Sequence, residues 1–295
     1  MKTAKKHVFA SLVILTASAV LAVNYLPLFA NSSLALTSHI KSHTSGQPAS
    51  AVNPPAVQPP DIFKPTVQAD INQAIATDGD VEVAVSLVDL DTGKQYDAGE
   101  TGVVFQAAST AKLIAVIDYL HEVELGNVTL DQTIDGTSAR QLIKQMLEVS
   151  DNTAWVDINN VLGSKQQAYA QSIGLTSFTG GEYNTITAAD EAKLLSLLYQ
   201  GKLINTEHKE LMYSYMNAAD GTNLIKSALP SDATVYHKYG MLGGNLHDTA
   251  IVNYQGHNFA LVIFTKNPND ELNDYSQRVA LIYSITQAIV ADIAA

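Results

Sequence analysis

The sequence contains no cysteine, and arginine occurs at only two of its 295 positions, Arg140 and Arg278. Without thiols the chain has no disulfide, no thiolate zinc site and no lipid attachment through cysteine. A net charge of −12 and the lack of a basic patch argue against a nucleic-acid partner. None of the eight histidines has the H-E-x-x-H spacing of a metalloprotease, so we expect no metal site. We also expect no organic cofactor.

The first thirty residues differ in composition from the rest of the chain. Three lysines within the first six residues precede a long apolar run from Val8 to Ala30. This order is typical of a secretory signal, and the whole run is also long enough for a membrane span. We therefore assign residues 1–30 to a signal peptide or an N-terminal membrane anchor. With lysines at the amino end, the remainder is expected outside the cytoplasm, either secreted or anchored.

The following residues divide into a linker and one folded domain. Residues 31–64 are rich in Ser, Thr, Pro, Gln and Ala and follow neither a helical nor a strand period, which predicts a disordered linker. Periodic apolar patterns begin near Pro65 and continue to the end of the chain. Residues 65–295 are therefore predicted to form a single domain, and we expect it to be a monomer.

The order of periodic segments in this domain predicts its fold class. Alternating segments predict strands at 81–90, 94–98, 234–240, 249–254 and 259–265. Helical spacing predicts helices at 67–76, 109–126, 138–149, 153–162, 165–173, 188–199, 207–216 and 275–293. Short turns between neighbouring strands, such as 255–258, imply antiparallel pairing. We predict an α/β fold of the α+β type: a five-stranded antiparallel sheet with the terminal helices on one face and a mainly helical block on the other.

One serine–lysine pair is placed where it could carry chemistry. Ser109 lies at the start of a predicted helix, and Lys112 follows three residues later on the same helix face. A neutral amine in that position can take the proton of the hydroxyl. The spacing alone is weak, because Ser38 and Lys41 share it within the linker. Ser109 could instead be a helix N-cap and Lys112 a solvated lysine, although the apolar neighbours of Lys112 favour burial.

Two later triplets complete a known pattern. Ser150-Asp151-Asn152 lies between two predicted helices, and Lys238-Tyr239-Gly240 lies on a predicted strand. Taken alone, Ser150-Asp151 could cap the helix that follows, and Lys238 could be a charged residue on an edge strand. Together and in this order, the three motifs resemble the S-x-x-K, S-D-N and K-T-G signature of class A β-lactamases and penicillin-binding D,D-peptidases. The resemblance covers about Pro65 to Ala295.

The resemblance implies a role for each motif residue. Ser109 would be the nucleophile, Lys112 its base and Ser150 a proton relay. Substrate would be held by four further positions: Asn152, Lys238, Gly240 and Met241. The backbone amides of Ser109 and Met241 would form the oxyanion hole. The implied substrate is a small molecule, either a β-lactam or a D-alanyl cell-wall peptide. Lys112 is a base only when neutral, which requires burial and a nearby positive charge such as Lys238.

Two positions depart from the family pattern. Class A β-lactamases carry a glutamate that activates the deacylating water, and the corresponding position here is Gly180; Glu182 is a weaker candidate for that role. Tyr239 replaces a small hydroxyl residue, and its ring is expected to narrow the mouth of the cleft. Both arginines are predicted on helices away from the late strands, so carboxylate binding would fall mainly to Lys238. His237 and His247 flank the third motif, and packing roles are favoured over substrate contact.

The sequence therefore predicts an exported serine hydrolase that cleaves a β-lactam or related amide through an acyl-Ser109 intermediate. One alternative is a D,D-peptidase or transpeptidase that acts on cell-wall peptides. Another is a surface protein that binds or senses penicillin and turns over slowly, which the Gly180 and Tyr239 departures favour. A purely structural wall-spanning protein is the third, supported only by the linker.

Overall fold

The computed structural model describes residues 61–77, 81–181, 183–219, 224–271 and 273–293. The predicted signal or anchor segment and nearly all of the predicted linker lie outside these residues. Within these residues, no helix is both long and apolar enough to cross a bilayer.

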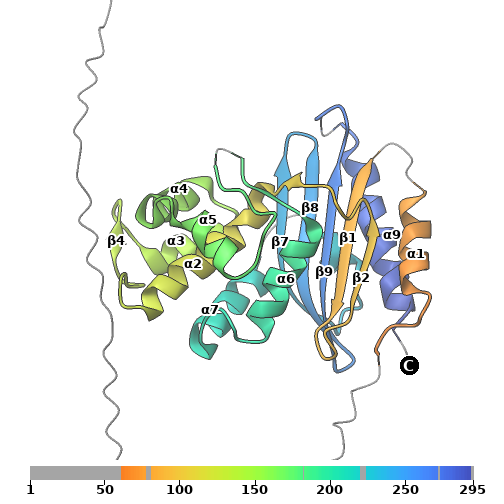
Figure 1. Ribbon diagram of the computed structural model, residues 1–295, viewed down its shortest axis with the longest axis horizontal. Coiled ribbons are helices and arrows are strands. Elements are labelled where there is room, and N and C mark those ends of the chain that lie inside the picture. Colours follow the sequence, from red (N-terminus) through yellow and green to blue (C-terminus); the bar gives the residue numbers. More distant parts are fainter. Residues whose placement is uncertain (1–60, 78–80, 182, 220–223, 272, 294–295) are drawn as a thin grey trace, which may run out of the picture. The chain divides into compact units, whose positions relative to one another are not determined.

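The folded part is built on a five-stranded antiparallel sheet in the order β2-β1-β9-β8-β7 (Figure 1). Its strands are β1 (Glu82–Asp89), β2 (Gln95–Gly99), β7 (Thr234–Leu242), β8 (Asn245–Tyr254) and β9 (His257–Lys266). Gln255 and Gly256 alone connect β8 to β9, with φ values of 52° and 82°. Positive φ at both residues matches the twist of a tight hairpin, so this turn is shorter than the predicted segment 255–258.

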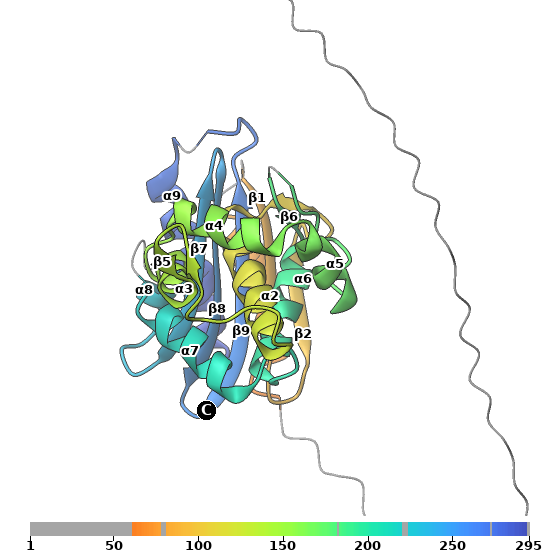
Figure 2. The same cartoon turned by 90° about the vertical axis from the view of Figure 1, so that its left-hand side faces the viewer.

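Helices cover both faces of the sheet (Figures 1 and 2). Two terminal helices, α1 (Val67–Ile75) and α9 (Tyr275–Ala291), pack on one face around an apolar core. On the other face α6 (Ala188–Tyr199) contacts β1, β8 and β9, and a second core joins the sheet to the helical block. That block contains α2 (Lys112–Glu124), α3 (Ala139–Glu148), α4 (Asn152–Leu162), α5 (Lys165–Ser172) and α7 (Thr206–Asn217). The predicted fold class is confirmed.

Several short elements were not predicted. They are β3 (Phe105–Gln106), a 3₁₀ turn η1 (Ala108–Ala111), β4 (Thr133–Ile134), β5 (Thr137–Ser138), β6 (Thr185–Ile186) and α8 (Leu224–Ala228). Two-residue strands show no period, so sequence patterns cannot reveal them. The pairing of β3 with β6 has a consequence for the site, because it joins the segment before Ser109 to the segment before α6.

The folded part begins earlier than the predicted boundary at Pro65. Ile62 and Phe63 are buried, and Phe63 forms a bridge with Ile293 near the end of the chain. Asp61 accepts hydrogen bonds from the side chains of Lys94 and Tyr96. The last residues of the predicted linker therefore belong to the core between α1, α9 and the sheet.

Candidate active site

The segment around Ser109 is held in a strained turn. Ala108 has a φ of +50°, a conformation that costs roughly 1–3 kcal/mol for a residue other than glycine. Ser109 lies in the 3₁₀ turn η1 and Lys112 is the first residue of α2. The Nζ of Lys112 is 2.8 Å from the Oγ of Ser109. The serine hydroxyl thus contacts the lysine amine instead of capping the helix.

Lys112 is buried, with 3% of its surface exposed, and is surrounded by oxygens. Besides Ser109, its Nζ contacts the backbone oxygen of Ser150 at 2.9 Å and the Oδ1 of Asn152 at 2.7 Å. Burial lowers the pKa of Lys112 to about 8, although the nearby charge of Asp151 acts in the opposite direction. The amine therefore loses its proton at a lower pH than an exposed lysine does.

The second motif supplies a hydroxyl between two lysines. The Oγ of Ser150 accepts from the Nζ of Lys238 at 2.9 Å and lies 3.4 Å from the Nζ of Lys112. Ser150 has a φ of +59°, so strain is stored here as it is at Ala108. Asp151 caps α4 by accepting from the backbone N–H of Ala154 at 2.8 Å. Asp151 therefore caps α4, as the alternative prediction for this motif proposed. Its two neighbours, Ser150 and Asn152, contact Lys112.

Lys238 lies on the edge strand β7, but its side chain is fully buried and not solvated. Burial and the nearby charge of Lys112 lower its pKa to about 7, and Asp248 opposes them. The ring of Tyr239 lies 4.5 Å from its ammonium group and packs against the core that contains α1 and α9. Neither Lys238 nor Tyr239 lines the cavity at Ser109, and the narrowing of the cleft mouth by the Tyr239 ring stays a prediction.

Gly240 lets β7 approach η1 closely. A Cβ atom at this position would lie 2.9 Å from the backbone oxygen of Ala107 and 3.1 Å from the backbone nitrogen of Ser109. Both atoms belong to the backbone of a constrained turn and cannot move aside cheaply. A residue with a side chain at position 240 would therefore push β7 away from the backbone of Ser109. Glycine allows the two backbones to come this close.

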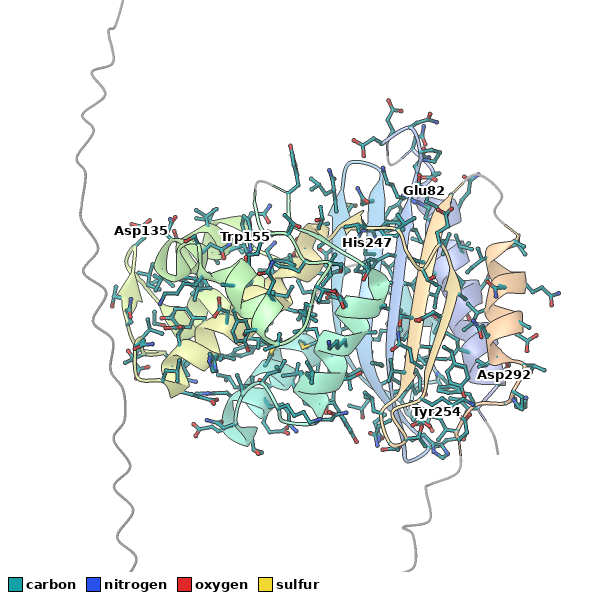
Figure 3. The ribbon with its side chains drawn as sticks, in the orientation of Figure 1. Glu82, Asp135, Trp155, His247, Tyr254 and Asp292 are labelled. Atoms are coloured by element: carbon teal, nitrogen blue, oxygen red, sulfur yellow. The ribbon has the colours of Figure 1, made fainter. Side chains whose placement is uncertain are left out.

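A cavity of about 310 Å³ opens at Ser109. It is lined by Ala108, Ser109, Lys112, Asn152, Trp155, Val156, Tyr183, Asn184, Met241 and Leu242. Sequence reasoning identified Ser109, Lys112, Asn152 and Met241 as site residues but did not assign Trp155, Tyr183 or Asn184 to the site. The predicted site residues Ser150, Lys238 and Gly240 do not line this cavity. Trp155, marked on α4 in Figure 3, is three residues after Asn152 on the same helix face, which was the available signal. Apolar side chains thus surround the polar group at Ser109.

Both histidines beside the third motif are fully buried. His247 has its Nε2 2.9 Å from the backbone oxygen of Gln106, while its Nδ1 accepts from the backbone N–H of Thr265. Because Nδ1 accepts, Nε2 carries the proton and donates. Burial lowers the pKa of His247 to about 4, which keeps it neutral. The Nδ1 of His237 lies 3.2 Å from the Oδ1 of Asp248. The favoured packing roles agree with these contacts.

The sequence matches the model of the beta-lactamase enzyme family over residues 66–293. The chain belongs to this family. Among solved structures, it resembles that of PBP-A, with a TM-score of 0.72 and 22% identity over 80% of this chain and 98% of the other. It also resembles a beta-lactamase from Xanthomonas campestris, with a TM-score of 0.71 and 19% identity over 78% and 98%. No curated protein matches the sequence significantly.

A third similar structure is that of a PBP-A mutant as its acyl-enzyme complex with penicillin G, with a TM-score of 0.69 and 22% identity over 77% of this chain and 95% of the other. At 19–22% identity, these solved structures establish the fold of the chain and nothing more. Together with the family match, the fold supports a serine β-lactamase-like hydrolase.

In this β-lactamase-family protein, the correspondence of Gly180 to the glutamate of class A β-lactamases stays a prediction from the motif pattern. A Cβ built at Gly180 would have only ordinary contacts, 3.7 Å to the Cβ of Gln167 and 3.9 Å to the Oδ1 of Asn184. The alternative candidate, Glu182, lies outside the described residues. None of the described residues that line the cavity at Ser109 carries a carboxylate.

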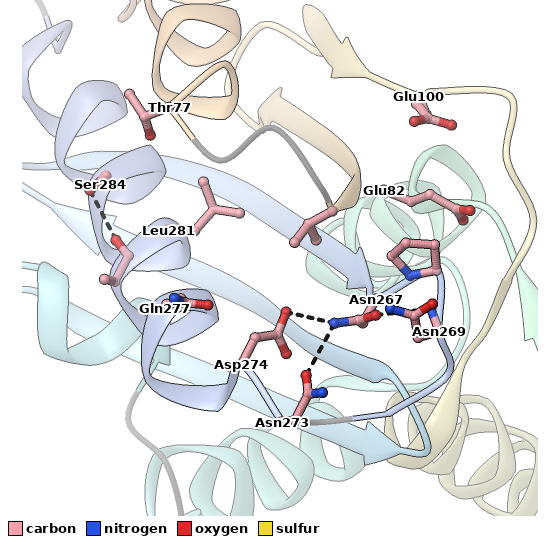
Figure 4. A pocket seen from close by; sticks show the side chains of 13 residues that line it. Thr77, Glu82, Glu100, Asn267, Asn269, Asn273, Asp274, Gln277, Leu281 and Ser284 are labelled. Carbon is pink, nitrogen blue, oxygen red and sulfur yellow. Dashed lines mark hydrogen bonds between the residues drawn. The ribbon is translucent and has the colours of Figure 1, made fainter.

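A larger cavity of about 1020 Å³ lies on the α1 and α9 side of this β-lactamase-family fold (Figure 4). None of the motif residues lines it. Asn267 donates there to Asp274 at 3.1 Å, and Asp274 also pairs with Arg278 at 3.4 Å. Arg278 also donates to the backbone oxygen of Gly244 between β7 and β8, so it reaches the late strands, contrary to the prediction. Within the described residues no group of three or more acidic or histidine side chains could hold a metal.

Proposed function

We propose that this protein is a serine hydrolase that cleaves β-lactams or related amides through an acyl-Ser109 intermediate. The observation that carries the proposal is the Ser109–Lys112 contact at 2.8 Å, made by a buried amine whose pKa is lowered to about 8. A hydroxyl with its own neutral base at hydrogen-bond distance is an activated nucleophile.

The acylation step can be derived from these contacts. Neutral Lys112 accepts the Ser109 proton as the Oγ–carbon bond forms, and the carbonyl oxygen takes up the negative charge. In this scheme the N–H groups of Ser109 and Met241 stabilise that oxyanion, and the close approach of β7 to η1 at Gly240 supports this assignment. The proton then passes through the Ser150 hydroxyl to the amide nitrogen, and the carbon–nitrogen bond breaks.

Lys238 and Asn152 hold the substrate in this scheme. When protonated, Lys238 donates to Ser150 and attracts a substrate carboxylate. The side chain of Asn152 already binds Lys112 through its Oδ1, which leaves its amide NH₂ group for a substrate carbonyl. No metal or organic cofactor takes part in the proposed steps.

Slow release of the acyl group is a second element of the proposal. A positioned general base contributes typically about 10²–10⁴ in rate, and Gly180 cannot supply one. This favours a D,D-peptidase or a penicillin-binding protein with a persistent adduct over a rapid β-lactamase. A surface location is proposed from the N-terminal sequence, where lysines precede a long apolar run.

Fluorescent penicillin tests the proposal on the full-length protein. We expect a covalent adduct on Ser109, identified by intact mass and peptide mapping, that Ser109→Ala abolishes. The lifetime of the adduct then separates the two candidate functions: rapid loss supports a β-lactamase, and persistence supports a peptidase or binding protein. An unmodified Ser109 would overturn the proposed function.

A further inference from the structure

Asp248 is a fully buried carboxylate on β8, opposite Tyr239 in the pairing of β7 with β8. Side chains alternate between the two faces of a sheet, so Asp248 and His237 lie on the face that α8 and α9 cover. Lys238 points to the other face, where its Nζ donates to Ser150. The carboxylate and the ammonium group therefore lie on opposite sides of the same two paired strands.

Three donors surround this carboxylate. Its Oδ2 accepts from the backbone N–H of Ile225 in α8 at 2.9 Å, and its Oδ1 accepts from the backbone N–H of Thr249 at 3.0 Å. The Nδ1 of His237 lies 3.2 Å from the same Oδ1. A neutral imidazole with its hydrogen on Nδ1 donates here without cancelling the charge of the carboxylate. These hydrogen bonds stabilise a negative charge on Asp248 inside the fold.

The cations of the helices packed on this face are bound elsewhere. Lys226 of α8 donates to the backbone oxygen of Asn217 at 3.1 Å. Arg278 of α9 pairs with Asp274 at 3.4 Å. Among the described residues, no lysine or arginine forms an ion pair with Asp248, whose charged partner is His237 only when that ring is protonated. The negative charge can therefore act on other buried groups, because the protein interior screens charges poorly.

Lys238 depends on such a charge more than an exposed lysine does. Its Nζ donates to the hydroxyl of Ser150 at 2.9 Å and to the backbone oxygen of Tyr239 at 3.0 Å, and both acceptors are neutral. Burial and the nearby charge of Lys112 lower the pKa of Lys238 to about 7, and the charge of Asp248 acts in the opposite direction. Asp248 is therefore the acid that favours the ammonium form of Lys238.

The other lysine of the site, Lys112, has a different acid nearby. Burial lowers the pKa of Lys112, and the charge of Asp151 raises it. Each lysine is thus accompanied by its own acid. We propose that Asp248 is a positioning residue that favours the protonated form of Lys238 from the opposite face of the sheet, and so extends to higher pH the range in which the site binds a substrate carboxylate. The inference rests on the proposed function, because Lys238 attracts that carboxylate in the proposed scheme.

The test compares penicillin G with its methyl ester, which lacks the carboxylate, on full-length wild type and Asp248→Asn. This substitution removes the charge and keeps the size of the side chain. Apparent affinity for penicillin G should begin to weaken about one pH unit lower in the variant, which makes it up to about tenfold weaker above pH 7. Affinity for the ester should match wild type, which also shows that the variant is folded. An unchanged pH dependence, or an equal loss for both compounds, would overturn the inference.

His237→Gln is the matched control, because it removes the imidazole from the same buried cluster and leaves the carboxylate in place. We expect this variant to keep the wild-type pH dependence. Titration of the lysine side chains by NMR measures Lys238 directly in the protein without substrate. Its midpoint should fall in Asp248→Asn and stay unchanged in His237→Gln, and equal midpoints in all three proteins would contradict the role of Asp248. If neither penicillin G nor its ester acylates wild-type Ser109, the proposed function fails, and the NMR titration still decides whether Asp248 controls the charge of Lys238.

Discussion

Two lysine amines with lowered pKa values face one serine hydroxyl, and each is kept there by burial. Lys112 and Lys238 both contact the Oγ of Ser150, and Lys112 also contacts Ser109. Burying amines at such short separation opposes folding, as do the positive φ values of Ala108 and Ser150. The site is thus maintained by the packing around it, and its reactivity depends on the protonation of two groups.

The pH dependence of acylation should reflect those two amines separately. At saturating penicillin, the rate constant should fall about tenfold per pH unit below pH 8, since only neutral Lys112 is a base and its pKa is lowered to about 8. Apparent affinity for penicillin should weaken above pH 7, where Lys238 loses its charge. Stopped-flow fluorescence with a labelled penicillin measures both the acylation rate constant and the apparent affinity. A rate constant that does not change between pH 6 and 9 would contradict the role of Lys112.

A single substitution should change the rate at which the acyl group is released. Gly180→Glu places a carboxylate beside Asn184, and a Cβ at this position makes only ordinary contacts. We expect deacylation to accelerate by about 10²–10⁴, the typical effect of a positioned general base. Adduct mass followed over time measures the rate, and Gly102→Glu is the control at a position with open space. An adduct lifetime equal to wild type would show that the base cannot act from this loop.

At the scale of elements, the contact between β7 and η1 brings the third motif to the first. Their approach depends on Gly240, and His247 reinforces it by donating to the backbone of Gln106 just before η1. Lys238 faces the same cleft because side chains alternate along a strand. The cleft is therefore assembled by one edge strand against one strained turn.

Gly240→Ala should disturb this contact with little effect elsewhere. The added Cβ would meet the backbone of Ala107 at 2.9 Å, which pushes β7 away from Ser109. We expect acylation to slow by about 10²–10³, the cost of a misplaced oxyanion donor. Acylation by penicillin and thermal unfolding should be measured together, with Gly102→Ala as the control. A variant that acylates at the wild-type rate would show that the approach of β7 is not limiting.

The α6 helix carries an acid inside the core. Glu191 is fully buried, both its carboxylate oxygens lack partners among the described residues, and burial raises its pKa to about 8. Between about pH 4 and 8 the folded protein keeps a proton that the unfolded chain has released, so stability falls as pH rises through this window. Glu191 thus destabilises the fold most at pH 8 and above.

Glu191→Leu should remove that dependence. We expect the free energy of unfolding at pH 8 to rise by about 1–4 kcal/mol, as found when buried charged groups are replaced by apolar ones. The gain should shrink at pH 5, where the wild-type carboxyl is neutral in the folded state and largely ionised only in the unfolded state. Urea denaturation at both pH values measures this gain in the free energy of unfolding. Glu210→Leu is the control, because Glu210 is exposed. A pH-independent difference would assign the effect to packing alone.

At the scale of the whole molecule, the two ends of the folded part meet. Phe63 packs edge-on against Tyr96 and Phe259, with ring centroids 5.8 and 5.6 Å apart, and bridges Ile293. These contacts join the start of the folded part to the end of α9 and to the sheet.

Two truncated chains test this boundary. A chain that starts at Pro65 should be less stable than one that starts at Asp61 by at least about 3 kcal/mol, because it lacks a buried phenylalanine and isoleucine. Urea denaturation of both chains gives the difference. Phe63→Ala in the longer chain should reproduce most of the loss. Equal stabilities would show that residues 61–64 contribute nothing to the core.

Long periodic segments and motif order were predictable from the sequence, because each is a local property. The spacing of Ser109 and Lys112 already implied one helix face, and the bounds of α6 match the predicted 188–199. The direction of the Tyr239 ring was not predictable, since it depends on the core behind β7. The reach of Arg278 to Gly244 and the burial of Phe63 likewise depend on contacts between segments far apart in the chain.

The sequence by itself determined the order of the long helices and strands, the sheet with its covered faces, and the three motifs that carry the chemistry. Each of these depends on residue types at short spacing. Only the tertiary structure decided that Ser150 lies between two lysines and that Gly240 faces the backbone of Ser109. These features depend on distances between segments of the chain that no local pattern encodes, because they are set by how the helical block packs against the sheet.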